Sequence, residues 1–140
     1  MYIFDTNVIS ELRKTKSGRA DKAVVKWVQS VPPSGAFLSA ITVYEIKLGI
    51  LKLVSRDPPE AQRLDDWLSH TIVPSFAGRI LPLDENVAIL LAGMMATRTR
   101  PYRDALIAAT AQHHGYAVVT RNFRDFAELP VRVINPWDFT

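Results

Sequence analysis

Five short apolar runs of strand type recur along the chain, and segments of helical pattern lie between them. The runs cover residues 2–4, 36–38, 79–81, 117–120 and 132–134. Strands that alternate with helices predict a mostly parallel sheet, because helical crossovers connect parallel strands and cover both faces of the sheet. We therefore expect an α/β fold in which functional side chains gather beyond the carboxyl ends of the strands.

Five longer segments have the apolar spacing of a helix that packs one face on a core. They are residues 20–31, 42–54, 59–72, 85–98 and 104–114. In the second of these segments, Glu45 and Gly49 share a face that points away from the apolar stripe. In the last, Asp104 shares a face with Ala108, so small side chains allow this helix to pack closely on the sheet.

Composition limits the class of protein. A chain of 140 residues with 48% hydrophobic and 22% charged residues is typical of one globular domain, and no linker or repeat divides residues 1–140. The absence of cysteine excludes disulfides, thiolate metal sites and a cysteine nucleophile, and it suits a reducing cytoplasm. The longest apolar stretch, "VAILLAGMMA", is too short to span a membrane, so we expect a cytoplasmic protein without a membrane partner.

The net charge of +3 is unevenly distributed. One basic cluster lies early in the chain and a second precedes Asp104; they comprise Arg13, Lys14, Lys16, Arg19, Lys22 and Lys26, and Arg98, Arg100 and Arg103. Basic clusters favour a polyanionic partner, because neutralised phosphates release their counterions. A solvated helix face would account for the same residues, so charge alone leaves nucleic-acid binding open.

Four acidic residues occupy positions where the predicted strands end or helices begin. Each has a simple explanation of its own. Asp5 and Asp104 could cap helices, Glu45 follows Thr42 at the spacing of a capping box, and Asp125 suits a turn.

Together, however, the four acids fall at one end of one predicted sheet. Four neighbouring carboxylates repel one another unless a cation lies between them or one takes up a proton. An oxygen-only cluster without Cys or His at ligand spacing suits a hard divalent cation, Mg²⁺ or Mn²⁺. An acidic hollow flanked by basic side chains suits metal-assisted attack of water on a phosphodiester.

Five segments in order resemble a PIN domain, and most of all the VapC toxins of the FitB-like branch. They are "DTNVISEL", "LSAITVYEIKLGI", "RDALIAATAQHHG", "VVTRNFRDF" and "VINPW". The resemblance implies a three-layer α/β/α sandwich with a mostly parallel central sheet. It also implies a Mg²⁺- or Mn²⁺-dependent endoribonuclease that is the toxin of a type II toxin–antitoxin pair. The partners implied are RNA as substrate, a cognate antitoxin, a second copy of the chain in a homodimer, and operator DNA only through the antitoxin.

The resemblance also implies roles for individual residues. Asp5, Glu45 and Asp104 match the family's most regular acids. Relatives place the fourth acid at the position of either Asn122 or Asp125; only Asp125 is charged here, so we assign it that role. The residues expected to orient these acids are Thr6, Asn7, Ser39, Thr120 and Asn122. The residues expected to contact RNA phosphates are Arg100, Arg103, Arg121 and Arg124.

Three other functions are weighed against this one. A PIN fold that binds RNA or a partner after losing catalysis is favoured by Asn122 and disfavoured by the acids that remain. A phosphatase of the haloacid dehalogenase type needs an acid two residues after the first, where this chain has Asn7. A metal-free ribonuclease could use His113 or His114 as a base, although histidine at a helix C-terminus is also explained by the helix dipole. The residues do not exclude DNA as the substrate.

Overall fold

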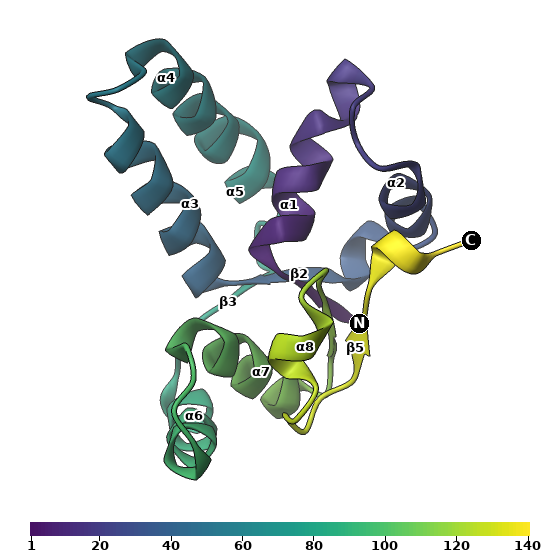
Figure 1. The fold of residues 1–140 in the computed structure, drawn as a ribbon, viewed down its shortest axis with the longest axis vertical. Coiled ribbons are helices and arrows are strands. Elements are labelled where there is room, and N and C mark those ends of the chain that lie inside the picture. Colours follow the sequence, from purple (N-terminus) through teal and green to yellow (C-terminus); the bar gives the residue numbers. More distant parts are fainter.

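The computed structural model describes residues 1–140 and has a five-stranded central sheet in the order β3-β2-β1-β4-β5 (Figure 1). All four strand pairings are parallel. The strands are β1 (Tyr2–Phe4), β2 (Ala36–Ser39), β3 (Ile80–Leu81), β4 (Ala117–Val119) and β5 (Val133–Ile134). The five expected strands are therefore confirmed to within one residue at their ends.

Helices cover both faces of the sheet, which confirms the three-layer α/β/α sandwich. In Figure 1, α1 to α5 lie on one side of the sheet and α6 to α8 on the other. These helices are α1 (Thr6–Arg13), α2 (Lys22–Gln29), α3 (Ala40–Leu53), α4 (Pro58–Trp67), α5 (Val73–Ser75), α6 (Glu85–Thr97), α7 (Tyr102–His114) and α8 (Phe123–Phe126). Shorter turns are η1 (Lys14–Ser17), η2 (Pro33–Gly35), η3 (Leu68–Ile72) and η4 (Pro136–Asp138).

Alternate residues of the central strands build two separate cores. Ile3 and Val118 pack with α6 and α7, whereas Phe4 and Val119 pack with α1, α3 and α4 on the opposite face. Successive side chains of a strand point to opposite faces, so a strand buried on both sides is apolar throughout. This is why β1 and β4 read as short, unbroken apolar runs.

Two helices begin earlier than the sequence predicts. α3 begins at Ala40 because the hydroxyl of Ser39 accepts a hydrogen bond from the backbone N–H of Ile41 at 3.2 Å. Thr42 is therefore not a cap but a fully buried residue in the first turn, so the capping box, the simple alternative explanation of Glu45, is excluded. α7 begins at Tyr102, which places Asp104 in its first turn rather than at its cap.

The segment expected to be one helix over 59–72 is divided. α4 ends at Trp67, and the wider π-helical turn η3 continues to Ile72. None of the helices is long and apolar enough to cross a membrane.

Because the strands are parallel, their carboxyl ends share one edge of the sheet. Asp5 follows β1, Ser39 ends β2 and Thr120 follows β4, so all three lie at this edge. The first turns of α1 and α3 begin there as well.

Candidate active site

Asp5 is fully buried at the carboxyl end of β1 and is held by several hydrogen bonds. Its Oδ1 accepts a hydrogen bond from the backbone N–H of Thr6 at 2.7 Å, which caps α1. Its Oδ2 accepts one from the hydroxyl of Thr120 at 2.7 Å and one from the side-chain amide of Asn7 at 3.4 Å. Asp5 is therefore both a helix cap and a fixed carboxylate of the site.

Glu45 reaches the same place from the second turn of α3. The hydroxyl of Thr6 donates a hydrogen bond to its Oε1 at 2.9 Å, and the Thr6 hydroxyl also lies 3.4 Å from that of Thr42. The expected site residue Thr6 is therefore hydrogen-bonded to Glu45. The hydroxyl of Ser39, by contrast, accepts a hydrogen bond from the start of α3 and forms no hydrogen bond with the acids.

Arg103 joins three acids through one guanidinium group. Its Nη2 donates to Asp5 Oδ1 at 2.7 Å and its Nε donates to Glu45 Oε2 at 2.5 Å, while its Nη1 pairs with Asp104. Burial by itself would lower the pKa of Arg103, but the bond to Glu45 and the charge of Asp5 raise it above its usual value. An internal cation therefore occupies the centre of the acidic cluster.

Asp104 is the acid whose protonation is most affected by this setting. Asp104 is only 4% exposed, and this burial raises the pKa of its carboxyl group from 3.8 to about 6. The charge of Arg103 opposes this rise, whereas the charges of Asp125, Asp5 and Glu45 add to it. A carboxyl group that gives up its proton near neutral pH is a common feature of functional sites.

The fourth expected acid is not bonded to the other three. Asp125 is exposed on α8 and forms no hydrogen bond or ion pair with them, although its charge acts on Asp104. The buried Thr120 links this loop to the cluster, since its Oγ1 accepts a hydrogen bond from the backbone N–H of Asn122 at 3.0 Å. Asn122 therefore contributes its backbone, and its amide makes no side-chain bond to an acid.

The candidate arginines differ in how much of their charge is free. Arg103 is fully engaged by the acids, and Arg100 donates to the hydroxyl of Thr97 at 3.3 Å. Arg121 lies 5.1 Å from the centre of the Trp137 ring and, like Arg124, is exposed. Neither forms an ion pair, and Arg121, unlike Arg124, lines the hollow above the acids.

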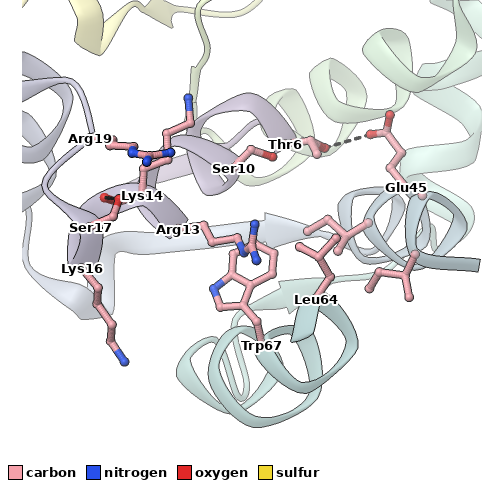
Figure 2. A pocket seen from close by; sticks show the side chains of 13 residues that line it. Thr6, Ser10, Arg13, Lys14, Lys16, Ser17, Arg19, Glu45, Leu64 and Trp67 are labelled. Atoms are coloured by element: carbon pink, nitrogen blue, oxygen red, sulfur yellow. Dashed lines mark hydrogen bonds between the residues drawn. The ribbon is translucent and has the colours of Figure 1, made fainter. Parts of the chain in front are cut away.

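The cluster opens into a hollow of about 490 Å³, which includes Asp5, Glu45, Arg103, Arg121 and Trp137 in its lining. A larger groove of about 800 Å³ runs beside it between α1–η1 and α3–α4 (Figure 2). The two hollows share Thr6, Ser10, Lys14 and Glu45 in their linings, so the groove leads directly to the acids.

Two residues of the site had a different interpretation in the sequence. The sequence predicts that Thr42 starts a helix, but in the structure its hydroxyl lies next to that of Thr6, which donates a hydrogen bond to Glu45. Arg103 was expected to bind RNA, but it pairs with the acids. The sequence contains one hint of this pairing, because Arg103 directly precedes Asp104. Adjacent side chains of a helix usually point in different directions, however, so the sequence does not predict an ion pair between them.

The family model described as PIN domain matches residues 2–131, and the chain belongs to the PIN domain family. It is 41% identical to Toxin FitB of Neisseria gonorrhoeae over 98% of this chain and 99% of that protein. It is 35% identical to VapC ribonuclease Y4jK of Sinorhizobium fredii over 99% of each protein. The resemblance found in the sequence is therefore confirmed.

Solved structures agree with the sequence relatives. The crystal structure of FitAcB from Neisseria gonorrhoeae superposes with a TM-score of 0.86 at 38% identity, covering 99% of this chain and 100% of that one. The structure of FitAB bound to an IR36 DNA fragment gives a TM-score of 0.85 at 36% identity, covering 100% of this chain and 98% of that one.

Proposed function

We propose that this chain is a divalent-cation-dependent endoribonuclease and the toxin of a type II toxin–antitoxin pair. The observation that carries the proposal is the convergence of Asp5, Glu45 and Asp104 on one cationic group at the carboxyl edge of the sheet. Relatives of matching length are named as a toxin and as a VapC ribonuclease, which supports the same activity.

The residues present suit a divalent cation once Arg103 moves away. With Arg103 in place, no three acidic or histidine side chains are close enough together to bind one ion. The guanidinium nevertheless marks a position that three carboxylates surround, and carboxylate oxygens are the ligands that Mg²⁺ and Mn²⁺ prefer. We assign Asp5, Glu45 and Asp104 to this cation, with Asp125 as a fourth ligand, direct or through water.

When bound, such a cation polarises the scissile phosphate and lowers the pKa of a water molecule. The chain's own residues prepare the site for it. Thr120 and Asn7 fix the carboxylate of Asp5, and Thr6 fixes that of Glu45. Arg103 neutralises the acids in the cation-free protein, which limits the repulsion between them.

The partners that we propose follow from the relatives. FitB and VapC relatives were solved as FitAB and VapBC complexes, some of them with DNA, which supports a cognate antitoxin that contacts operator DNA. We also propose cytoplasmic action on RNA and a homodimer, which light scattering of the purified protein would test.

The first experiment incubates antitoxin-free protein with structured and single-stranded RNA in Mg²⁺, in Mn²⁺ and in EDTA. Asp5→Asn, with folding checked by circular dichroism, is run beside the wild type. We expect cleavage that requires the cation and is lost in the variant. Cleavage that persists in EDTA would contradict the proposal, since the acids would then act without a cation.

A second candidate is a PIN fold that binds RNA or a partner without cleaving it. The uncharged Asn122 favours it, as does the exposed Asp125, which shares no ion pair with the three acids that Arg103 joins. A folded protein that binds RNA but cleaves none of a broad panel, and whose melting temperature does not respond to Mg²⁺ or Mn²⁺, would support this alternative.

A further inference from the structure

The groove beside the acidic cluster has two unlike walls (Figure 2). One wall is the basic stretch of α1 and η1 that carries Arg13, Lys14, Lys16 and Arg19. The other is the apolar surface of α3 and α4, formed by Ile46, Ile50, Leu64 and Trp67. A cationic wall facing an apolar wall is the arrangement with which proteins hold single-stranded nucleic acids, whose phosphates and bases need different surroundings.

The charges of the basic wall are only partly used within the protein. Arg13 pairs with Glu60 of α4 at 2.7 Å and lies 5.9 Å from the centre of the Trp67 ring, so it reaches the apolar wall at this point. Lys14 pairs with Glu11 at 3.2 Å. Lys16 and Arg19 are exposed and take part in no ion pair. Glu45 is the one acidic residue of the lining, so the groove attracts an anion along most of its length.

Gly49 provides an observation that is independent of charge. It lies in the interior of α3, where glycine destabilises a helix relative to alanine. Packing does not require it, because a Cβ atom at this position would meet nothing within 4 Å. The missing side chain leaves the helix backbone bare where it lines the groove, which suits the close approach of a ligand.

The groove ends at the acids. Figure 2 shows Thr6 and Glu45, joined by their hydrogen bond, at one end of the groove. Lys16 and Arg19 lie on the η1 side, away from that pair. A strand that lies along the groove would therefore bring one of its phosphodiesters to the cluster.

We propose that this groove binds a single-stranded segment of the RNA substrate, with phosphates on Lys16 and Arg19 and a nucleoside against the bare backbone at Gly49. The proposal rests on the proposed function, because it takes the acidic cluster as the place of cleavage. An apolar peptide segment of a protein partner would use the Ile46 wall but would not need the free cations or the bare backbone.

The test measures RNA binding in EDTA, where the proposed cleavage does not occur. The probe is a fluorescein-labelled single-stranded RNA of about 12 nucleotides, with a duplex of the same length for comparison. The variants are Gly49→Met and Gly49→Ala. The matched controls are Gly93→Met and Gly93→Ala in α6, where a Cβ also meets nothing within 4 Å and which lies outside the groove.

We expect Gly49→Ala and Gly93→Ala both to raise the melting temperature, because alanine favours the helix. Only the Gly49 variants should weaken binding of the single strand, by about threefold for alanine and about tenfold or more for methionine, as a side chain fills the groove. Opposite effects on stability and on binding would distinguish a bare backbone kept for a ligand from a glycine kept for folding.

The Lys16→Gln, Arg19→Gln double variant tests the basic wall. We expect the slope of log Kd against log salt to fall by about 1.4, the value for two phosphate contacts to a single strand. Unchanged affinity in Gly49→Met, or an unchanged salt slope in the double variant, would overturn the proposal and leave the groove to a protein partner. Binding is measured without cleavage, so failure of the proposed nuclease activity would be seen separately.

Discussion

The acidic cluster and the adjoining groove share part of their lining but manage charge in opposite ways. In the cluster, one guanidinium already pairs with three carboxylates. In the groove, Lys16 and Arg19 are exposed and have no acidic partner. The difference teaches that, under the proposed function, the cluster would exchange the Arg103 guanidinium for an external cation before it acts, whereas the exposed cations of the groove are already available to an anion.

The largest expected effect concerns the acids. Asp104→Asn should lower RNA cleavage by roughly 10³-fold or more, because a cation that stabilises the transition state by several kcal/mol would lose a ligand. The measurement is the single-turnover cleavage rate in Mn²⁺. Glu85→Gln, an exposed acid on α6, is the control and should keep the full rate. Full activity of Asp104→Asn in excess metal would exclude Asp104 from the cation site.

The next effect concerns the internal cation. Arg103→Ala leaves three carboxylates without their common partner, so the cation-free protein should lose about 2–4 kcal/mol of unfolding free energy. Mg²⁺ or Mn²⁺ should then raise its melting temperature more than that of the wild type, because Arg103 no longer competes for the same acids.

Arg63→Ala is the control for this variant, since Arg63 forms an exposed pair with Glu60 and should change stability far less than Arg103→Ala does. An equal metal-induced shift in Arg103→Ala and in the wild type would mean that guanidinium and metal do not share a position.

A further prediction concerns pH. Burial raises the pKa of Asp104 to about 6 in the folded protein, so the folded state binds this proton more tightly than the unfolded state does. The unfolding free energy should therefore fall as pH rises from 3.8 towards about 6 and then level off, by at most about 3 kcal/mol. Urea unfolding of the metal-free protein would show this, and Asp104→Asn should lack it. Parallel pH profiles for the two proteins would refute the assignment.

The smallest effect concerns the rim of the acidic hollow. Arg121→Gln should weaken RNA binding less than Arg19→Gln does, because the guanidinium of Arg121 is already placed over the Trp137 ring. Fluorescence anisotropy with the same single-stranded RNA would rank the two variants. The reverse order would place the main phosphate path at the rim rather than in the groove.

The parallel sheet and its active edge could be predicted because they depend on local patterns. Strands buried on both faces produce unbroken apolar runs, and parallel order brings their carboxyl ends together. Asp5 and Thr120, far apart in sequence, could therefore be placed at the same edge of the sheet. The strand order makes them neighbours, and a 2.7 Å hydrogen bond joins them.

Three features of the site could not be predicted, because neighbouring residues suit the same role equally well or because the feature depends on several elements at once. Ser39 and Thr42 are both good caps, and the first was used because β2 ends at Ser39. The position of Asp125 depends on how the chain turns after β4, where two polar residues were equally suitable. The conformation of the long Arg103 side chain follows from where three separate elements place their acids, which no single segment encodes.

The hydrogen bond between Thr120 and Asp5 spans 115 positions of sequence, and β1 pairs with β4 over the same separation. While residues 117–120 are still inside the ribosome, β1 therefore lacks its neighbour β4, and Asp5 lacks the hydroxyl of Thr120. Long-range strand pairing of this kind forms late in folding, because the chain loses the entropy of closing a long loop before the contacts between the strands stabilise it. The acidic site is therefore completed only late in synthesis, and a transcript cut short before codon 117 yields a product without a complete site.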